Sequence, residues 1–502
     1  MQYKGINIIP KVSVNSREEL SLVYTPGVGA SCLKIKENSD ASYIYTNRIN
    51  SVAVIADNYQ KALQRAIFLK NVLLIDAYPL CIKEMNVKNL KFIVDNIEPN
   101  FNAIDLSCIE IEEKSLINFD VKIPVLTTSV SDLKEFFGCV ARNAFMPDIN
   151  KFEGTIQEKS LQLREFFGGV LETQLNEEET RKPVAIISDG SAVLGFGNIG
   201  AVAGLPVMEG KAVLFKSLGG VDAMPLCIKT QDPNEIIDLV LLLEDSFSGV
   251  NLEDISAPRC FEIEERLKEK SKIVIFHDDQ HGTAIVVLAA VLNALHLAKK
   301  EIENTKVVFS GAGAAAQAVC KLFLKAGFKN IVMNDINGAV YAGREQNDSS
   351  LEEISKYTNL EKIKGALKDT IINADVFIGL SAPNVLSEEM IKTMADKPII
   401  LALANPTPEI NPQLAKQAGA FIVATGRSDF ANQVNNSLAF PGLFKGVLEG
   451  SLSKITDEMK LECAFSIASL VNENELSVNK IIPEPLDYRI PEVIAENIKK
   501  MD

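Results

Sequence analysis

An internal repeat constrains the fold of this 502-residue chain more than any other feature. DAYPLCIK returns as DAMPLCIK, and FNAIDL returns as FSGVNL, both displaced by 146 positions (76 to 222 and 101 to 247). Softer matches keep the same order: VAVIAD (52–57) with VAIISD (184–189), CIEIEE (108–113) with CFEIEE (260–265), KIPVLTT (122–128) with KIVIFHD (272–278), and QYKGIN (2–7) with KFEGTI (151–156). One α/β domain is therefore predicted twice. Copy A would span residues 1–135, a connector 136–150, and copy B 151–283.

The copies differ at the positions that could carry chemistry. Copy A has Tyr24 in the turn YTPGV, where copy B reads LREFFGGV. Copy B has Lys211, which aligns with Arg65 of copy A, and an arginine is a poor proton acceptor. The copy A positions that match Glu253, His277 and Asp278 are Ser107, Thr127 and Thr128. The copies are predicted to be complementary, with the tyrosine in one and the lysine and carboxylates in the other.

Carboxylates follow two strand-like runs of copy B. Glu253 and Asp254 end FSGVNLED, Asp278 and Asp279 follow KIVIF, and a helix is expected between them at about 260–269. Such a unit brings both acidic pairs to one edge of a parallel sheet, where α/β proteins keep their sites. Oxygen donors without cysteine favour Mg²⁺ or Mn²⁺. The ordinary alternative is that these residues cap a helix or solvate a loop.

A dinucleotide-binding domain is predicted over residues 284–445. KVVFSGAGAAAQAVCKLFLKAG reads as a strand, a glycine turn and a helix, and the next strand, NIVMND, ends at Asp335. Gly311 and Gly313 would let the backbone approach a pyrophosphate at the helix N-terminus. Asp335 would accept hydrogen bonds from the ribose, and Ile336 and Asn337 supply no cation for a 2′-phosphate, so NAD is favoured over NADP. The nucleotide-binding turn is predicted to comprise Gly311, Ala312, Gly313, Ala314 and Ala315.

Three more strand-like runs complete this domain, at 375–384, 398–410 and 421–426, and each ends in a turn. Asn405 and Asn436 follow such strands and could donate amides to a ligand, or could simply stabilise turns. Residues 446–502 read as helices. The predicted class is α/β, with a duplicated N-terminal α/β substrate domain and a doubly wound Rossmann-type NAD(P)-binding domain.

Composition excludes several classes of protein. A net charge of −15 argues against a nucleic-acid partner. The eight cysteines form no CxxC pair and suggest buried thiols in a reducing compartment. No uninterrupted apolar run approaches the roughly 18 residues that span a bilayer, and the start of the chain has no apolar leader. A cytoplasmic protein without a membrane partner is expected.

Taken together, the motifs resemble malic enzymes of the shorter, bacterial type. The matching stretches are YTPGV (24–28), SDGSAVLGFGNIG (188–200), VMEGKAVLFK (207–216), NLEDISAP (251–258), FHDDQHGTA (276–284), GAGAAA (311–316), ALANPTPE (402–409) and NNSLAFPG (435–442). The resemblance covers copy B and the nucleotide domain almost continuously. The departure is that the family joins the tyrosine segment directly to the SDG segment, whereas here copy A intervenes.

The resemblance implies oxidative decarboxylation of (S)-malate to pyruvate and CO₂ with reduction of NAD(P), through metal-bound oxaloacetate. It implies Lys211 as general base and Tyr24 as general acid. Mg²⁺ or Mn²⁺ would bind Glu253, Asp254 and Asp279. Asn405 and Asn436, with Lys211, would contact the substrate, and Asn405 would also contact the nucleotide. A homo-oligomer, specifically a homodimer, is expected.

Two other functions fit the same residues. One is a malolactic-type decarboxylase that retains NAD, and the other is a non-catalytic regulator that binds NAD and a dicarboxylate. The duplication also has two readings: an internal pseudo-dimer that divides one site between its copies, or a decayed insertion past which Tyr24 reaches the site of its own chain.

Overall fold

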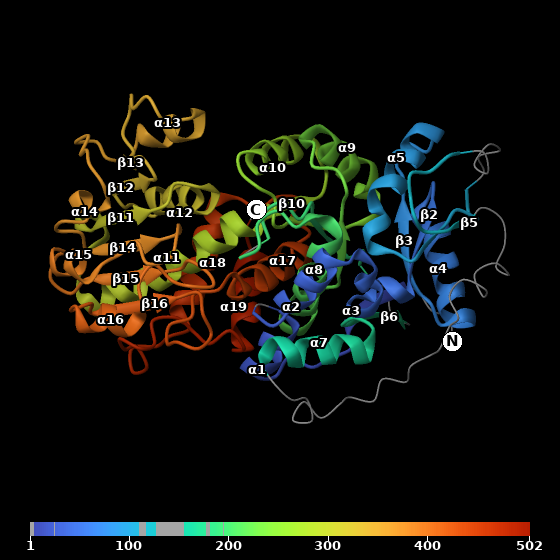
Figure 1. Cartoon of the computed structure of the whole chain (residues 1–502), viewed down its shortest axis with the longest axis horizontal. Coiled ribbons are helices and arrows are strands. Elements are labelled where there is room, and N and C mark those ends of the chain that lie inside the picture. The colour runs from blue at the N-terminus through green and yellow to red at the C-terminus, as the bar shows by residue number, and fades with distance from the viewer. Residues whose placement is uncertain are drawn as a thin grey trace. The chain divides into compact units, whose positions relative to one another are not determined.

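The computed structural model describes residues 5–24, 26–109, 117–126, 155–176, 181–193 and 195–501 (Figure 1). The chain divides into two compact units, a first unit of residues 1–276 and a second unit of residues 277–502. The predicted connector, 136–150, lies outside the described residues, and so do Thr127 and Thr128.

The first unit contains, in its described part, two four-stranded sheets and a two-stranded ribbon, with helices around them. Its elements are β1 (Gly5–Pro10), α1 (Arg17–Val23), α2 (Gly29–Glu37), η1 (Ser39–Ala41), α3 (Ser42–Tyr45), η2 (Asn47–Asn50), β2 (Ser51–Ala56), α4 (Tyr59–Leu73), β3 (Asp76–Cys81), α5 (Val87–Ile97), η3 (Glu98–Asn100), β4 (Ala103–Asp105), β5 (Val125–Leu126), α7 (Ile156–Phe167), β6 (Leu171–Asn176), β7 (Val184–Ser188), α8 (Gly200–Gly219), β8 (Ala223–Cys227), α9 (Pro233–Leu243), η6 (Glu244–Ser246), β9 (Gly249–Leu252), α10 (Arg259–Lys270) and β10 (Val274–His277).

The two four-stranded sheets repeat one topology. Their strand orders are β3-β2-β4-β5 and β8-β7-β9-β10, which are equivalent when the strands are taken in chain order. Val52 of β2 pairs with Ala77 and Ala103, and its counterpart Val184 of β7 pairs with Ala223 and Gly249. The partners in the two sheets are again 146 positions apart. The sequence repeat is therefore a repeat of structure with the same strand register.

Two local predictions for this unit are wrong. The echo between QYKGIN and KFEGTI does not pair equivalent elements, because Gly5 begins a strand and Thr155 caps a helix. The Thr155 hydroxyl accepts from the Glu158 N–H, and the Glu158 carboxylate accepts from the Thr155 N–H, a capping box that commits the segment to α7. Strand β1 instead pairs antiparallel with β6.

The stretch YIYTNRINSVAVIAD (43–57), rich in β-branched and aromatic residues, predicts one strand that ends at Asp57, and this second prediction is wrong. Only Ser51–Ala56 is extended, and the stretch before it forms the helical turns α3 and η2. The side chain of Thr46 accepts from the Arg48 N–H and so starts η2. A local cap therefore overrides the β-branched and aromatic composition.

The second unit is built on a six-stranded sheet of order β13-β12-β11-β14-β15-β16. Its elements are α11 (Asp278–Ala298), η7 (Ile302–Asn304), β11 (Lys306–Ser310), α12 (Ala314–Lys325), β12 (Asn330–Asp335), β13 (Gly338–Ala339), α13 (Ser349–Ser355), α14 (Leu367–Thr370), β14 (Val376–Gly379), α15 (Glu388–Lys392), β15 (Ile399–Ala402), α16 (Pro412–Gln417), β16 (Ile422–Thr425), η8 (Asn436–Leu438), α17 (Phe440–Glu449), α18 (Asp457–Ser469) and α19 (Arg489–Ile498).

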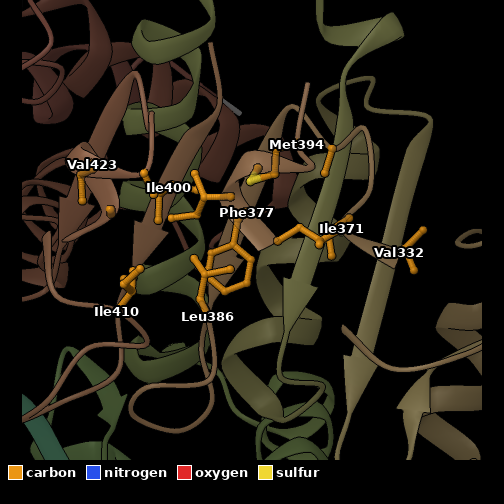
Figure 2. Close-up of a cluster of buried hydrophobic side chains, with 14 residues drawn as sticks. Val332, Ile371, Phe377, Leu386, Met394, Ile400, Ile410 and Val423 are labelled. Carbon is orange, nitrogen blue, oxygen red and sulfur yellow. The ribbon is translucent and has the colours of Figure 1, made fainter. Parts of the chain in front are cut away.

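Strands β12 and β14 lie on opposite sides of β11, and both pair with it in parallel. This is the doubly wound arrangement that was predicted, with its switch point between β11 and β14. One face of the sheet is covered by a hydrophobic cluster that includes Val332, Phe377, Ile400 and Val423 from four strands, joined by Leu386 and Met394 from the connections (Figure 2).

Helix α11 is long and apolar enough, by length and composition, to cross a membrane, with a mean hydropathy of 1.7. In the fold, 67% of that window is buried, which is typical of a core helix in a water-soluble domain. The predicted domain boundary at 283/284 falls inside α11, and the predicted boundary at 445/446 falls inside α17. The first compact unit ends at Phe276. The predicted assignment of functions to domains stays a prediction.

Candidate active site

Tyr24 lies against helix α8 at Gly210, the residue before the predicted base. It follows the last residue of α1 and is 9% exposed. A Cβ added to Gly210 of α8 would stand 2.3 Å from the carbonyl oxygen of Val23 and 3.1 Å from Cδ2 of Tyr24. Only a glycine allows this approach. Lys211 is the next residue of α8, so Tyr24 contacts this helix one residue before the predicted base. The roles of acid and base stay predictions.

A buried arginine that was not predicted from the sequence holds this contact. Arg164 of α7 donates from Nη2 to the carbonyls of Val23 (3.2 Å) and Pro206 (3.0 Å), and from Nη1 to Oε2 of Glu209 (3.0 Å). Glu209 also accepts from the Asn47 N–H at 2.5 Å. Burial raises the pKa of the Glu209 carboxyl, and the Arg164 guanidinium opposes that rise. The pair ties the end of α1 to α8 immediately before Lys211.

Lys211 is fully buried, and its Nζ donates to Oε1 of Glu253 at 2.6 Å. Oε2 of Glu253 accepts from Nδ2 of Asn251 at 2.9 Å, and the backbone N–H of Glu253 donates to the carbonyl of Ile187 in β7. One oxygen of this carboxylate is therefore held by helix α8 and the other by strand β9. The predicted base and one predicted metal ligand form a single buried ion pair.

Asp254 has a backbone conformation that residues other than glycine rarely adopt. Its φ is 53°, in the left-handed region, and the residue is 4% exposed. Its carbonyl accepts from the N–H of Ala192, in the glycine-rich loop after β7. A non-glycine residue held in this region costs on the order of 1 kcal/mol and is typical of functional sites.

The predicted acidic residues of the second unit begin helix α11. Asp278 is fully buried and accepts from Nδ2 of Asn436 at 2.5 Å, so the asparagine predicted to contact substrate hydrogen-bonds to a carboxylate. Nδ1 of His277 lies 2.6 Å from Nε2 of Gln280, and its Nε2 lies 3.6 Å from Oδ2 of Asp279. His277 thus interacts within its own helical turn.

The donors proposed for a cation are chemically suitable for one. Glu253, Asp254 and Asp279 offer carboxylate oxygens, the ligands that Mg²⁺ and Mn²⁺ prefer. In the part of the chain that the structure describes, no three His, Cys, Asp or Glu side chains form a metal-binding group. Glu253 and Asp254 belong to the first unit and Asp279 to the second.

The glycine turn after β11 has the geometry expected of a phosphate-binding turn. Gly311 has φ 113°, and a Cβ there would stand 2.5 Å from the carbonyl of Leu380, at the end of β14. Gly313 is the N-cap of α12, is exposed, and a Cβ on it would meet nothing within 4 Å. The N-terminus of α12 is therefore uncovered at Gly313. Phosphate binding by Gly311, Ala312, Gly313, Ala314 and Ala315 stays a prediction.

Asp335 ends β12, where the ribose-binding acid was predicted, but it forms an ion pair that was not predicted from the sequence. Arg344 holds both of its oxygens, Nη1 to Oδ1 at 2.9 Å and Nη2 to Oδ2. The same guanidinium also donates to Asn347 Oδ1 and is 6% exposed. The sequence does contain a basic residue nine positions after Asp335, but the prediction rested only on the two residues that follow it directly, Ile336 and Asn337.

Asn405 follows β15, and its Nδ2 lies 3.0 Å from the position of a Cβ on Gly426, just after β16. Nearby, the fully buried Glu409 accepts from the N–H groups of Ala404 (3.0 Å) and Ser381 (3.1 Å). Burial raises the pKa of Glu409, and these backbone donors oppose the rise. Glu409 thereby joins the loops that leave β14 and β15.

Two family models match the chain. Residues 280–498 match the malic enzyme NAD-binding domain, and residues 4–71 and 149–268 match the malic enzyme N-terminal domain. The chain is 54% identical over 318 residues to the bifunctional malic/malolactic enzyme of Bacillus subtilis, covering 63% of this chain and 78% of that protein. The chain belongs to the malic enzyme family.

Other malic enzymes agree with this assignment. The NADP-dependent malic enzyme of Escherichia coli is 47% identical over 334 residues, which cover 63% of this chain and 44% of that protein. The crystal structure of the NAD-dependent malic enzyme of Thermotoga maritima is 50% identical, covers 63% of this chain and 84% of that one, and has a TM-score of 0.61. The predicted family and fold class are confirmed, and NAD(P) is the nucleotide class. The N-terminal family model divides between the copies and omits residues 72–148, which hold β3, α5, β4 and β5.

Proposed function

We propose that this malic enzyme converts (S)-malate to pyruvate and CO₂ while reducing NAD, with Lys211 as the base and Tyr24 as the acid. The observation that supports these roles best is the close approach of the Tyr24 segment to Gly210, which puts the phenol beside the residue that precedes Lys211. The family match supports the overall reaction.

The two residues balance the protons of the reaction. Lys211, when neutral, takes the proton of the C2 hydroxyl as hydride leaves C2 for the nicotinamide. Loss of CO₂ then leaves electrons at C3, and Tyr24 donates a proton there. One proton is taken and one is given, so return of the Lys211 proton to Tyr24 restores the starting state. Glu253, at 2.6 Å, holds the Lys211 amine in place throughout.

The donors proposed for a divalent cation are Glu253, Asp254 and Asp279. Such a cation, when bound, supplies Lewis-acid polarisation of the substrate oxygen and stabilises negative charge as CO₂ leaves.

We further propose NAD rather than NADP as the preferred nucleotide. The Asp335 carboxylate stands at the end of β12, and a 2′-phosphate would meet its negative charge. The Arg344 donors are already used by Asp335 and Asn347, and the guanidinium is buried.

The test is a coupled assay with L-malate, Mn²⁺ and NAD or NADP. Equal amounts of pyruvate and reduced nucleotide, with a higher kcat/KM for NAD, are expected. Lactate without net NADH would replace this proposal by malolactic decarboxylation, an activity that appears in the name of the Bacillus subtilis relative. Nucleotide binding without turnover would favour the regulator.

A further inference from the structure

Contacts between the two copies in the first unit occur in reciprocal pairs. The N–H of Lys83 donates to the carbonyl of Leu242 (2.9 Å), and the N–H of Lys229 donates to the carbonyl of Asn96 (3.1 Å). Adding 146 turns Lys83 into Lys229 and Asn96 into Leu242. Copy A thus touches copy B through the same two positions by which copy B touches copy A.

The ion pairs repeat this relation. Lys83 Nζ lies 2.5 Å from Oε1 of Glu244, and Lys229 pairs with Glu98, the counterpart of Glu244. Hydrogen bonds at the ends of β3 and β8 are also reciprocal, although the accepting side chains differ. The Cys81 N–H donates to Ser246 Oγ, and the equivalent Cys227 N–H donates to Asn100 Oδ1, each at 2.7 Å.

The two strands of the β1–β6 ribbon are related in the same way, because each makes the equivalent contact to one of the copies. Ile8 faces Thr173 across the ribbon. The Ile8 N–H donates to Oδ1 of Asp222 in copy B, and the Thr173 N–H donates to Oδ1 of Asp76 in copy A, each at 2.9 Å. Contacts in which residue i meets j and j meets i are the signature of a two-fold interface between identical subunits. Here the interface lies inside one chain.

Only one of the two pseudo-equivalent helices can accept the tyrosine. Helix α8 carries Gly210 and Lys211, whereas α4 carries Gln64 and Arg65 at the matching positions. Arg65 pairs with Asp105 of β4 at 2.8 Å, as Lys211 pairs with Glu253 after β9. Copy A thus has an ion pair at this helix, but its acid, Asp105, matches Asn251 of copy B and not Glu253. The proton acceptor and the space beside it are absent from α4.

We propose that the first unit is a fused two-fold dimer that retains one working centre, with Tyr24 of copy A acting on the Lys211 and Glu253 of copy B in the same chain. The proposal rests on the proposed function for the roles of Tyr24 and Lys211. In this proposal copy A is the dimer partner of copy B, because it occupies the surface that a second identical domain would occupy. The acid, Tyr24, therefore acts within its own chain.

The test combines two full-length variants, Tyr24→Phe and Lys211→Ala, co-expressed with different affinity tags. Material purified through both tags is expected to be no more active than the two variants alone, and the absence of doubly tagged material would agree equally with action in cis. If the tyrosine acts across chains, mixed dimers would each regain one complete centre, and the co-expressed pool would recover about a quarter of wild-type activity. That recovery would overturn the proposal.

A matched control uses the double variant Tyr24→Phe/Lys211→Ala co-expressed with the wild-type chain. Action in cis leaves the activity per wild-type chain unchanged, whereas action in trans lowers it, because a mixed dimer then has no complete centre. Thermal melting of each variant monitors folding. Failure of the proposed function is separate, since it would appear as an inactive wild-type protein before any variants are combined.

Discussion

Gly210→Ala is the substitution that most directly tests the contact between Tyr24 and helix α8. The added methyl would stand 2.3 Å from the Val23 carbonyl oxygen. To restore an ordinary separation of about 3.5 Å between the methyl and this oxygen, the Tyr24 segment would have to move by roughly 1 Å. The segment has little freedom to yield elsewhere, because Arg164 also holds the Val23 carbonyl at 3.2 Å. Overpacking of this kind costs about 1–3 kcal/mol of folding free energy.

The catalytic loss is expected to exceed the loss of stability. A misplacement of about 1 Å in a reacting group can cost on the order of 10²-fold in rate. The variant should therefore lose about 10²-fold in kcat at a temperature well below its melting midpoint, with a smaller change in KM for malate. Steady-state kinetics and a thermal melt on the same preparation separate the two effects.

Gly204→Ala on the same helix is the matched control. Its methyl would lie 3.6 Å from Val193 Cγ2 and 3.7 Å from Gly190 Cα, which are ordinary contacts. Alanine favours a helix over glycine by up to about 1 kcal/mol, so this variant should keep its kcat and melt at the same or a higher temperature. If both variants keep wild-type kcat, Tyr24 does not need its place against α8, and its assignment as the acid fails.

Three further substitutions test the remaining roles. Lys211→Ala should lower kcat by about 10²–10⁴-fold while NAD binding, followed by fluorescence, is retained, because only the proton acceptor is removed; a normal kcat would reject the base. Asp335→Ser should raise the NADP to NAD ratio of kcat/KM by about tenfold or more, because the freed Arg344 guanidinium can then pair with a 2′-phosphate; an unchanged ratio would show that Asp335 does not select the nucleotide. For Glu244, burial opposes ionisation, but hydrogen bonds from Lys83 and neighbouring donors prevail and lower its pKa. Its ionised form therefore stabilises the fold above the unfolded carboxyl pKa of about 4.3, and this contribution is lost as pH falls through the lower folded pKa. Glu244→Gln should cost about 1–2 kcal/mol at pH 7, seen as a lower melting temperature, and the difference from wild type should shrink toward pH 3; a difference independent of pH would refute the ion-pair origin.

The features predictable from the sequence are those that local pattern determines. The strands that end at Asp335 and after Phe377 and the glycine turn at Gly311 follow from hydrophobic periodicity and turn chemistry. The repeat was also visible, because equal strand register requires equal spacing of the apolar residues.

The features that were missed depend on contacts between distant segments. Arg164 meets Glu209 across 45 positions, and no local pattern distinguishes it from a surface arginine of a helix. The role of Gly210 appears only once Val23 is seen beside it. Arg344 was missed for a different reason, because the loop after β12 folds back and returns a residue nine positions away to Asp335.

Fusion of the two copies changes how the interface between them can evolve. In a symmetric dimer of identical chains, every substitution at the interface appears twice, so a side chain must suit both of its places at once. In this chain each substitution appears once. Asn100 faces Cys227, whereas Ser246 faces Cys81, so two different side chains now hold equivalent backbone groups. One half of the pair was thereby free to become a scaffold while the other kept the lysine and the carboxylates.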